Sequence, residues 1–130
     1  MNDMRKDDRK QLGNLGEALA ESYLREHSYR IVHRNWRCKI GEVDVVAEVE
    51  GVLVFVEVRT RRLTDHLGTA KESVDQRKQR KVRDIAQMYL QVFKKFDTRV
   101  RFDVMTVELS ADSTPTSMGT PVITHIEGAF

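Results

Sequence analysis

Two valine-rich runs joined by a short polar turn constrain the fold of this chain more than any other feature. Residues 41–49 and 52–59 each have the length and the β-branched composition of a strand. Between them stands Glu50-Gly51, and glycine readily adopts the positive φ that a two-residue hairpin loop requires. The sequence therefore predicts a β-hairpin in which Val49 pairs with Val52.

The hairpin register brings acidic side chains together. Continued along both strands, it places Asp44 directly opposite Glu57, and Arg59 follows on the same face. Directly opposed Cβ atoms are about 5 Å apart, so two carboxylates held there repel each other. Such a pair among apolar residues indicates a divalent cation between them. The same register sets Glu42 opposite Arg59, which leaves an exposed lattice of cross-strand salt bridges as the alternative interpretation.

Helical periodicity predicts two helices in one domain that spans residues 1–130. Apolar residues at helical spacing indicate a first helix from Leu12 to His27, preceded by a polar start at 1–10 that is expected to fray. A second helix, capped by Asp75 or Ser73, is expected to bury one apolar stripe, made of Val82, Ile85, Ala86, Tyr89, Leu90 and Phe93.

Three further strands complete the predicted order. They are expected at 29–33, running on toward Trp36, at 99–107, and at 121–126 on a sheet edge. A loop is expected at 61–73, and the Ser-, Thr- and Pro-rich segment 110–121 predicts a flexible surface loop. The order α-β-β-β-α-β-β predicts an α/β fold in which helices flank a mixed β-sheet.

Positive charge is concentrated in the middle of the chain. The whole chain has 22 basic and 20 acidic residues, a net charge of +2 that does not identify a partner. Between Arg59 and Arg83, however, nine Lys and Arg residues stand against three Asp and Glu. This patch indicates a nucleic acid or another polyanion, and a solvated helix face is the alternative. The residues expected to contact DNA are Arg61, Arg62, Arg77, Lys78, Gln79, Arg80 and Lys81.

The single cysteine and the polar N-terminal segment limit the remaining possibilities. Cys38 alone excludes an intrachain disulfide and a cysteine-based zinc site. The sequence contains neither a signal-peptide pattern nor an apolar run as long as a membrane span. We therefore expect a cytoplasmic protein without a membrane partner.

A cation at the hairpin site would be held by oxygen ligands. Asp44 and Glu57 suit Mg²⁺ or Mn²⁺, which bind one or two carboxylates and keep waters for a substrate phosphate. Arg59 is placed to contact that phosphate or to stabilise its developing charge. Glu17 flanks the apolar stripe of the first helix and is a third candidate acid. Its alternative role is in a capping box, because it stands three residues after Asn14.

Six short motifs carry a family resemblance over nearly the whole chain. They are Gly16-Glu17, Arg34-Asn35-Trp36-Arg37-Cys38, Gly41-Glu42-Val43-Asp44, Val56-Glu57-Val58-Arg59-Thr60-Arg61, Arg77-Lys78-Gln79 and Phe102-Asp103-Val104. In this combination the chain resembles the YraN-type family of small bacterial proteins. That family is similar to restriction-endonuclease-like nucleases of the PD-(D/E)xK type, archaeal Holliday-junction resolvases among them.

The resemblance implies a metal-dependent DNA endonuclease. Glu17 would correspond to the acid of the first helix, Asp44 to the central Asp, and Glu57 to the Glu of the E-x-K element. It also implies a homodimer that binds branched DNA. The chain departs from the pattern at Arg59, where the family of nucleases has lysine. Arginine stays charged and cannot serve as a general base, although it still stabilises a phosphate.

The sequence leaves three functions open. The leading hypothesis is Mg²⁺- or Mn²⁺-dependent hydrolysis of phosphodiester bonds in DNA. The second is a non-catalytic DNA-binding module on the same fold, which the presence of Arg59 favours. The third is a protein–protein adaptor that pairs through an exposed strand edge.

Overall fold

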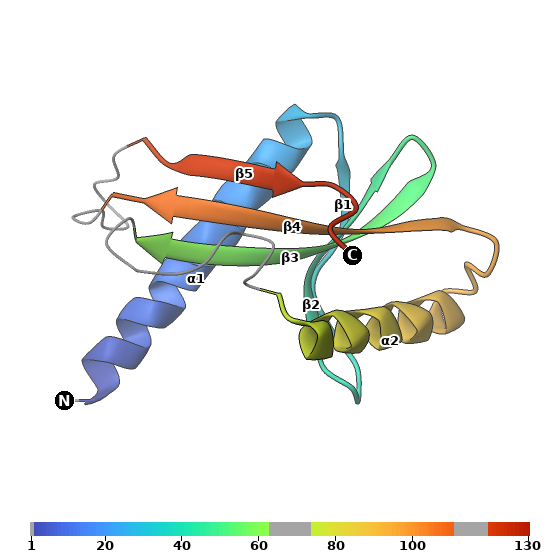
Figure 1. Ribbon diagram of the computed structural model, residues 1–130, viewed down its shortest axis with the longest axis horizontal. Helices are drawn as coiled ribbons and strands as arrows, with labels where there is room; N and C mark the ends of the chain where they lie inside the picture. Colours follow the sequence, from blue (N-terminus) through green and yellow to red (C-terminus); the bar gives the residue numbers. More distant parts are fainter. Residues whose placement is uncertain (1, 63–73, 111–119) are drawn as a thin grey trace.

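A computed structural model describes residues 2–62, 74–110 and 120–130 of the chain (Figure 1). It confirms the predicted order of two helices and five strands. The elements are α1 (Asn2–Glu26), β1 (Arg30–Arg37), β2 (Glu42–Val49), β3 (Val52–Arg62), α2 (Gln76–Val92), β4 (Arg99–Leu109) and β5 (Val122–Ile126).

The five strands form one mixed sheet in the order β1-β2-β3-β4-β5. Strands β3 and β4 are parallel, with Val52 opposite Arg99 at one end and Arg62 opposite Leu109 at the other. The other neighbours are antiparallel. The chain between β3 and β4 contains α2, as a parallel connection requires. The last strand lies at a sheet edge, as predicted.

The predicted hairpin register is confirmed. Val49 pairs with Val52, and the pairing continues to Val45 and Val56. Glu50 and Gly51 have φ values of 47° and 78°, which are typical of a tight hairpin turn. Val45 and Val56 are the last residues of β2 and β3 that pair with each other. Toward Glu42, β2 remains paired with β1, and toward Arg62, β3 remains paired with β4. The sheet therefore forks at this point.

The two helices cover opposite faces of the sheet (Figure 1). Alternate strand residues point to opposite faces, and they divide between two core clusters. The first cluster joins Ala20 and Leu24 of α1 to Val45, Val54, Val56 and Met105. The second joins Val82, Ile85, Ala86 and Tyr89 of α2 to Val46, Leu53 and Phe55. Neither helix, within the described residues, is long and apolar enough to cross a membrane.

The boundaries of several elements differ from the prediction. Helix α1 begins at Asn2 and not near Leu12, because Met, Arg and Lys favour a helix even where no apolar stripe marks it. Strand β3 continues to Arg62, where the sequence predicted that a loop begins at 61, because parallel pairing with β4 extends that far. Within the predicted loops, residues 63–73 and 111–119 lie outside the described residues.

Helix α2 has the predicted cap and nearly the predicted stripe. The Asp75 side chain accepts a hydrogen bond from the backbone N–H of Lys78 at 2.9 Å, so Asp75 is the N-cap. Phe93 was expected within the buried stripe, but it is the C-cap residue and 38% exposed. The helix has ended there, so the helical periodicity no longer directs this side chain into the core.

Gly16 sets how closely α1 approaches the sheet. A Cβ atom at this position would overlap the Thr60 Oγ1 atom and lie 2.7 Å from the Thr60 Cβ atom. Only glycine therefore allows the helix to pack directly over β3. At Gly13, one turn earlier, no described atom other than the neighbouring residues and backbone of α1 itself lies within 4 Å of the equivalent position.

We expect the two glycines of α1 to respond in opposite ways to alanine. Gly16→Ala should lower the free energy of unfolding by about 1–3 kcal/mol, because the helix has to move away from β3. Gly13→Ala should raise it by up to about 1 kcal/mol, because alanine favours the helix and meets nothing. Urea denaturation of both variants measures the difference. Equal effects at both positions would contradict the close approach.

Asp103 anchors the C-terminal residues through a buried ionic network. Its carboxylate accepts hydrogen bonds from Arg101 at 2.8 and 2.9 Å, from the backbone N–H of Gly128 at 3.0 Å, and contacts His125 Nε2 at 2.7 Å. Burial alone would raise the pKa of Asp103, but the hydrogen bonds from His125, Arg101 and Gly128 outweigh it and lower the pKa. The ionised form is therefore the form that stabilises the fold.

Removing the charge of Asp103 should destabilise the protein in a pH-dependent way. Asp103→Asn should cost about 2 kcal/mol near neutral pH, because hydrogen bonds to a charged group are lost. A lowered folded pKa contributes stability above the unfolded value of about 3.9 and loses it as the pH falls through the folded value. The difference between wild type and variant in urea denaturation should therefore shrink below about pH 4. A difference that is constant with pH would argue against an ionised Asp103.

Candidate active site

The fork between β2 and β3 is held open by a side chain. Asp44 Oδ2 accepts a hydrogen bond from the backbone N–H of Val58 at 2.8 Å. A carboxylate thus takes the place that a backbone carbonyl of β2 would occupy in a continued ladder. Asp44 and Glu57 are brought together as predicted, but they are not a ladder pair, because the pairing has ended one residue earlier.

Glu57 lies in the floor of the fork and is almost inaccessible to water. The residue is 3% exposed, and one carboxylate oxygen, Oε2, lies 3.6 Å from Lys78 Nζ on α2. The other oxygen, Oε1, is buried and has no hydrogen-bond partner within the part of the chain that the structure describes. A buried carboxylate oxygen without a partner is costly, so a ligand that contacted Oε1 would lower the energy of the site.

Glu17 reaches Asp44 from α1, on the other side of the sheet from Lys78. Asn35 of β1 hydrogen-bonds the Glu17 carboxylate. The helix is fixed one turn further on, where the buried Glu21 pairs with Arg34 at 2.7 Å. Consecutive strand residues normally point to opposite faces of a sheet. Asn35 has a φ of 48°, so the side chains of Arg34 and Asn35 both contact acids of α1.

Burial and mutual repulsion disfavour the ionised forms of the three acids. Burial first, and the charge of Asp44 second, raise the pKa of Glu17 to about 7. The same two causes, in the same order, raise the pKa of Glu57 to about 7, although Lys78 and Arg59 oppose them. Burial also raises the pKa of Asp44, against the hydrogen bond from Val58 and the charge of Lys78. Perturbed acids gathered in one place are typical of functional sites.

The acids fit a divalent cation that takes only part of its ligands from the protein. In the described residues, no group of three or more His, Cys, Asp or Glu side chains has the arrangement to hold a metal ion alone. Asp44 with the unpartnered Glu57 Oε1 offers two carboxylates. This matches Mg²⁺ and Mn²⁺, whose sites commonly use one or two carboxylates and complete the shell with water and phosphate.

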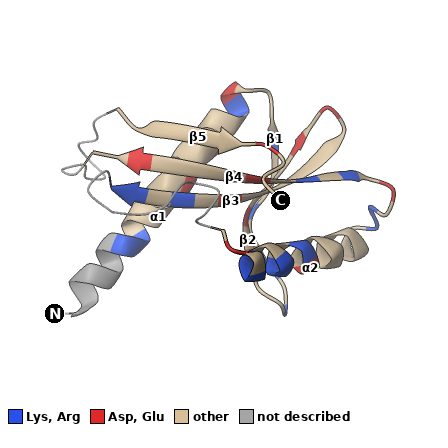
Figure 2. Ribbon diagram, in the orientation of Figure 1, with Lys and Arg blue, Asp and Glu red and all other residues tan. Residues whose placement is uncertain are grey.

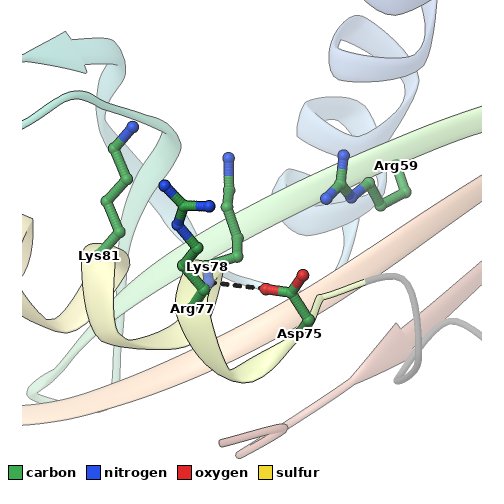
Figure 3. Close-up of a pocket in the computed structure, with 5 residues that line it drawn as sticks. All are labelled: Arg59, Asp75, Arg77, Lys78 and Lys81. Atoms are coloured by element: carbon green, nitrogen blue, oxygen red, sulfur yellow. Dashed lines mark hydrogen bonds between the residues drawn. The ribbon is translucent and has the colours of Figure 1, made fainter.

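A basic pocket adjoins the acids on the α2 side. It has a volume of about 330 Å³ and is lined by Arg59 of β3 together with Asp75, Arg77, Lys78 and Lys81 (Figure 3). The three α2 cations extend from the helix toward the top of the view, and the Arg59 guanidinium lies to their right on β3 (Figure 3). Basic residues gather on the first turns of α2 and on the C-terminal end of β3 (Figure 2). The site thus combines buried acids with a cationic rim.

The other residues that were predicted to contact DNA differ in how far their side chains are already engaged in other interactions. Arg61 pairs with Glu108 of β4 at 3.4 Å, and Arg62 ends β3. The Gln79 amide donates to the Val74 carbonyl at 3.0 Å, so it fixes the entry to α2. Arg80 is exposed and lines a second hollow on α2, with Arg77, Lys81, Asp84 and Ile40.

The predicted pairing of Glu42 with Arg59 through the hairpin register is wrong. The paired residues of β2 and β3 end before these positions, and Glu42 is instead opposite Arg37 of β1, which it bonds at 2.6 Å. The alternative interpretation, an exposed lattice of salt bridges across the hairpin, therefore lacks the residue pairing that it required. Glu57 is buried, whereas that lattice required an exposed carboxylate.

Two residues of the site were not predicted in their positions. Asn35 belongs to one of the motifs, but the sequence predicts no role for it at the site. The available signal is that asparagine tolerates the positive φ found there. Lys78 was predicted to contact DNA, but it also lies beside Glu57. The structure therefore places a lysine beside Glu57, although Arg59 stands where the resemblance to the nucleases would put a lysine.

The order and pairing of the helices and strands identify the fold class of the protein. The mixed five-stranded sheet, its two helices and their order are consistent with a restriction-endonuclease-like fold. Residues 16–107 match the model described as "Uncharacterised protein family UPF0102", and the chain belongs to this family. The YraN-type assignment made from the motifs is thereby confirmed.

Relatives from several bacteria match nearly the full chain. A UPF0102 protein of Geobacter metallireducens is 40% identical over 121 residues, which are 93% of this chain and 93% of the relative. One from Caldanaerobacter subterraneus subsp. tengcongensis is 37% identical over 98% of this chain and 100% of its own length. A third, from Mycobacterium bovis, is 42% identical over 92% of each chain.

Neutralising Glu57 should stabilise the metal-free protein. Its folded pKa of about 7 lies above the ordinary value, so the folded state holds an extra proton between those values, and stability falls as the pH rises through that window. Glu57→Gln stays neutral, and at about pH 8 it should raise the free energy of unfolding by about 2 kcal/mol in the presence of EDTA. Near pH 4 the two proteins should be alike.

Glu48→Gln is the matched control for this measurement. Glu48 lies on β2, forms an ion pair with Arg30 at 3.1 Å, and its side chain is 35% exposed. The loss of such a pair changes stability by less than about 1 kcal/mol. Glu57→Gln that proved no more stable than Glu48→Gln at about pH 8 would contradict the strain assigned to the buried carboxylate.

Proposed function

We propose that this protein is a DNA endonuclease that hydrolyses phosphodiester bonds with Mg²⁺ or Mn²⁺. The observation that carries the proposal is the buried Glu57 oxygen without a described hydrogen-bond partner, held beside Asp44 at the fork of the sheet. Two carboxylates confined in this way repel each other, and a divalent cation between them would relieve both the repulsion and the missing hydrogen bond. The expected cytoplasmic location agrees with a DNA substrate.

Each residue of the site has a role in this proposal. Asp44 and Glu57 would hold the cation, which when bound polarises a phosphoryl oxygen and lowers the pKa of a coordinated water. Glu17, with a pKa of about 7, is suited to accept a proton at neutral pH. Arg59 and Lys78 lie on the cationic side of Glu57, where they would bind the phosphate and stabilise negative charge that develops on it.

The rest of the basic surface would hold the nucleic acid backbone. Arg77, Arg80 and Lys81 extend the positive charge along α2, and Arg62 extends it along β3 (Figure 2). Contacts of this kind bind phosphates without regard to base sequence. Branched DNA as the preferred substrate and a homodimer as the assembly stay predictions of the family resemblance.

A non-catalytic DNA-binding module is the second candidate. The observation that favours it is Arg59 at the position of the E-x-K lysine, because arginine does not exchange protons in this range of pH. In that case the acids would serve only metal-assisted binding or the architecture of the fork. The two candidates differ in one property, which is turnover.

Titration calorimetry with Mn²⁺ at about pH 8 tests the metal site directly. Wild-type protein should bind Mn²⁺ saturably, and both Asp44→Asn and Glu57→Gln should lose at least about tenfold in affinity, since a ligand charge is removed. Glu48→Gln should bind as the wild type does. Asp44→Asn is preferred to alanine because its amide oxygen still accepts the Val58 N–H, which keeps the fork intact.

Cleavage assays on linear, flapped and four-way DNA complete the test. Turnover in wild type that Asp44→Asn and Glu57→Gln abolish would support the endonuclease. Saturable metal binding without turnover on any of these substrates would favour the binding module. Neither metal binding nor turnover, or turnover that persists in both variants, would exclude the site.

A further inference from the structure

The basic pocket beside the acids has features of a binding site in its own right. Its cations come from two elements, Arg59 from β3 and three others from the first two turns of α2. Its volume of about 330 Å³ exceeds that of one phosphate group and leaves room for several waters, each of which occupies about 30 Å³. The pocket therefore has the size and the charge for a small anionic group.

Hydrogen bonds fix the first turn of α2, which carries two of the cations, and a packing contact positions Lys81. Asp75 caps α2 through the Lys78 backbone, and the Gln79 amide ties the first turn to Val74. The hydrocarbon stem of Lys81 lies over Gly41, where a Cβ atom would come within 2.7 Å of Lys81 Cε. Pre-positioned cations lose little conformational freedom when an anion binds.

The charge of the pocket exceeds the requirement of an internal phosphate. Four cations and one carboxylate, Asp75, line it, and Lys78 pairs with Glu57 at 3.6 Å. No described carboxylate forms an ion pair with Arg77 or Lys81, so these two side chains offer two positive charges to a ligand. A phosphodiester carries one negative charge, whereas a phosphate monoester carries about two at neutral pH.

We propose that this pocket binds the terminal phosphate monoester of a nucleic acid strand. Such a strand would be held by its phosphorylated end on α2, next to the acids at the fork. The inference rests on the proposed function for the identity of the substrate as DNA. It goes further by assigning a preference for strand ends that carry phosphate over ends that carry a hydroxyl group.

Binding of single strands measured by fluorescence anisotropy in EDTA tests the proposal. The probes are strands of one sequence that differ only in a 5′-phosphate or 5′-hydroxyl, with the fluorophore on the 3′ end, and a matching pair for the 3′-phosphate. Wild type should bind one phosphorylated form about tenfold more tightly than its hydroxyl form, since charge-assisted hydrogen bonds are gained. Inorganic phosphate should compete selectively with that form.

Three charge-neutralising variants on α2 separate the pocket from general attraction to DNA. Arg77→Gln and Lys81→Gln should each bring the ratio of affinities for the phosphate and hydroxyl forms toward one. Arg80→Gln is the matched control, because Arg80 is on the same helix and does not line the pocket. It should weaken both forms equally and keep the preference. Circular dichroism and thermal unfolding establish that each variant is folded.

The outcomes distinguish this inference from the proposed function. Equal affinity of the wild type for phosphate and hydroxyl ends would contradict phosphate binding in the pocket. A phosphate preference that Arg80→Gln removes as fully as Arg77→Gln would contradict it as well. The assay needs neither metal nor cleavage. A phosphate preference in a protein that neither binds Mn²⁺ nor cleaves DNA would support the phosphate pocket and contradict the nuclease proposal. Cleavage of DNA without any phosphate preference would support the nuclease proposal and contradict the phosphate pocket.

Discussion

The hydrogen bond from the Val58 N–H to Asp44 is the contact on which the rest of the site depends. It replaces one backbone bond of the β2–β3 ladder with a bond to a carboxylate, so the ladder ends and the sheet opens. Because β3 stays paired with β4 on its other edge, Glu57 remains inside the sheet when β2 leaves it. The opening then admits Glu17 from one face and Lys78 from the other.

This arrangement stores unfavourable electrostatic energy in a well-packed domain. Three carboxylates converge where burial already disfavours their charges, and only one side of Glu57 meets a cation. The two core clusters on either side of the sheet hold the strands in place despite this repulsion. A site that opposes the stability of its own fold is expected where function requires it, since the same residues with neutral side chains would pack at lower cost.

The sequence predicts the features that depend on neighbours along the chain. Val49 and Val52 were paired correctly because strand periodicity and a glycine turn fix the register locally. Asp75, one of the two caps that the sequence predicts, is also recognised from residues close along the chain. The fork was not predicted, because it depends on a side chain that competes with the backbone for the Val58 N–H. That competition also explains why the expected opposition of Glu42 and Arg59 fails.

Long-range contacts account for the remaining differences at the site. Lys78 is far from Glu57 in sequence, and only the path of the chain from β3 into α2 brings the two together. Asn35 reaches Glu17 because a positive φ turns its side chain out of the alternating pattern of β1, which periodicity cannot show. Both residues belong to sequence motifs, but the spacing within each motif does not show which acid the residue contacts. The tertiary structure identifies Glu57 as the partner of Lys78 and Glu17 as the partner of Asn35.

The pairing of Glu57 with Lys78 divides the site into two halves of opposite charge. On one side, Asp44 and the unpaired Glu57 oxygen attract a cation, and on the other, Arg77 and Lys81 attract an anion. A ligand of only one sign would satisfy one half and intensify the imbalance of the other. A phosphate group accompanied by a divalent cation satisfies both halves at once, and nucleic acids carry such pairs along their entire length. The opposed halves are therefore the physical basis for proposing a phosphate ester with its metal ion, and not a free metal ion or a free anion alone.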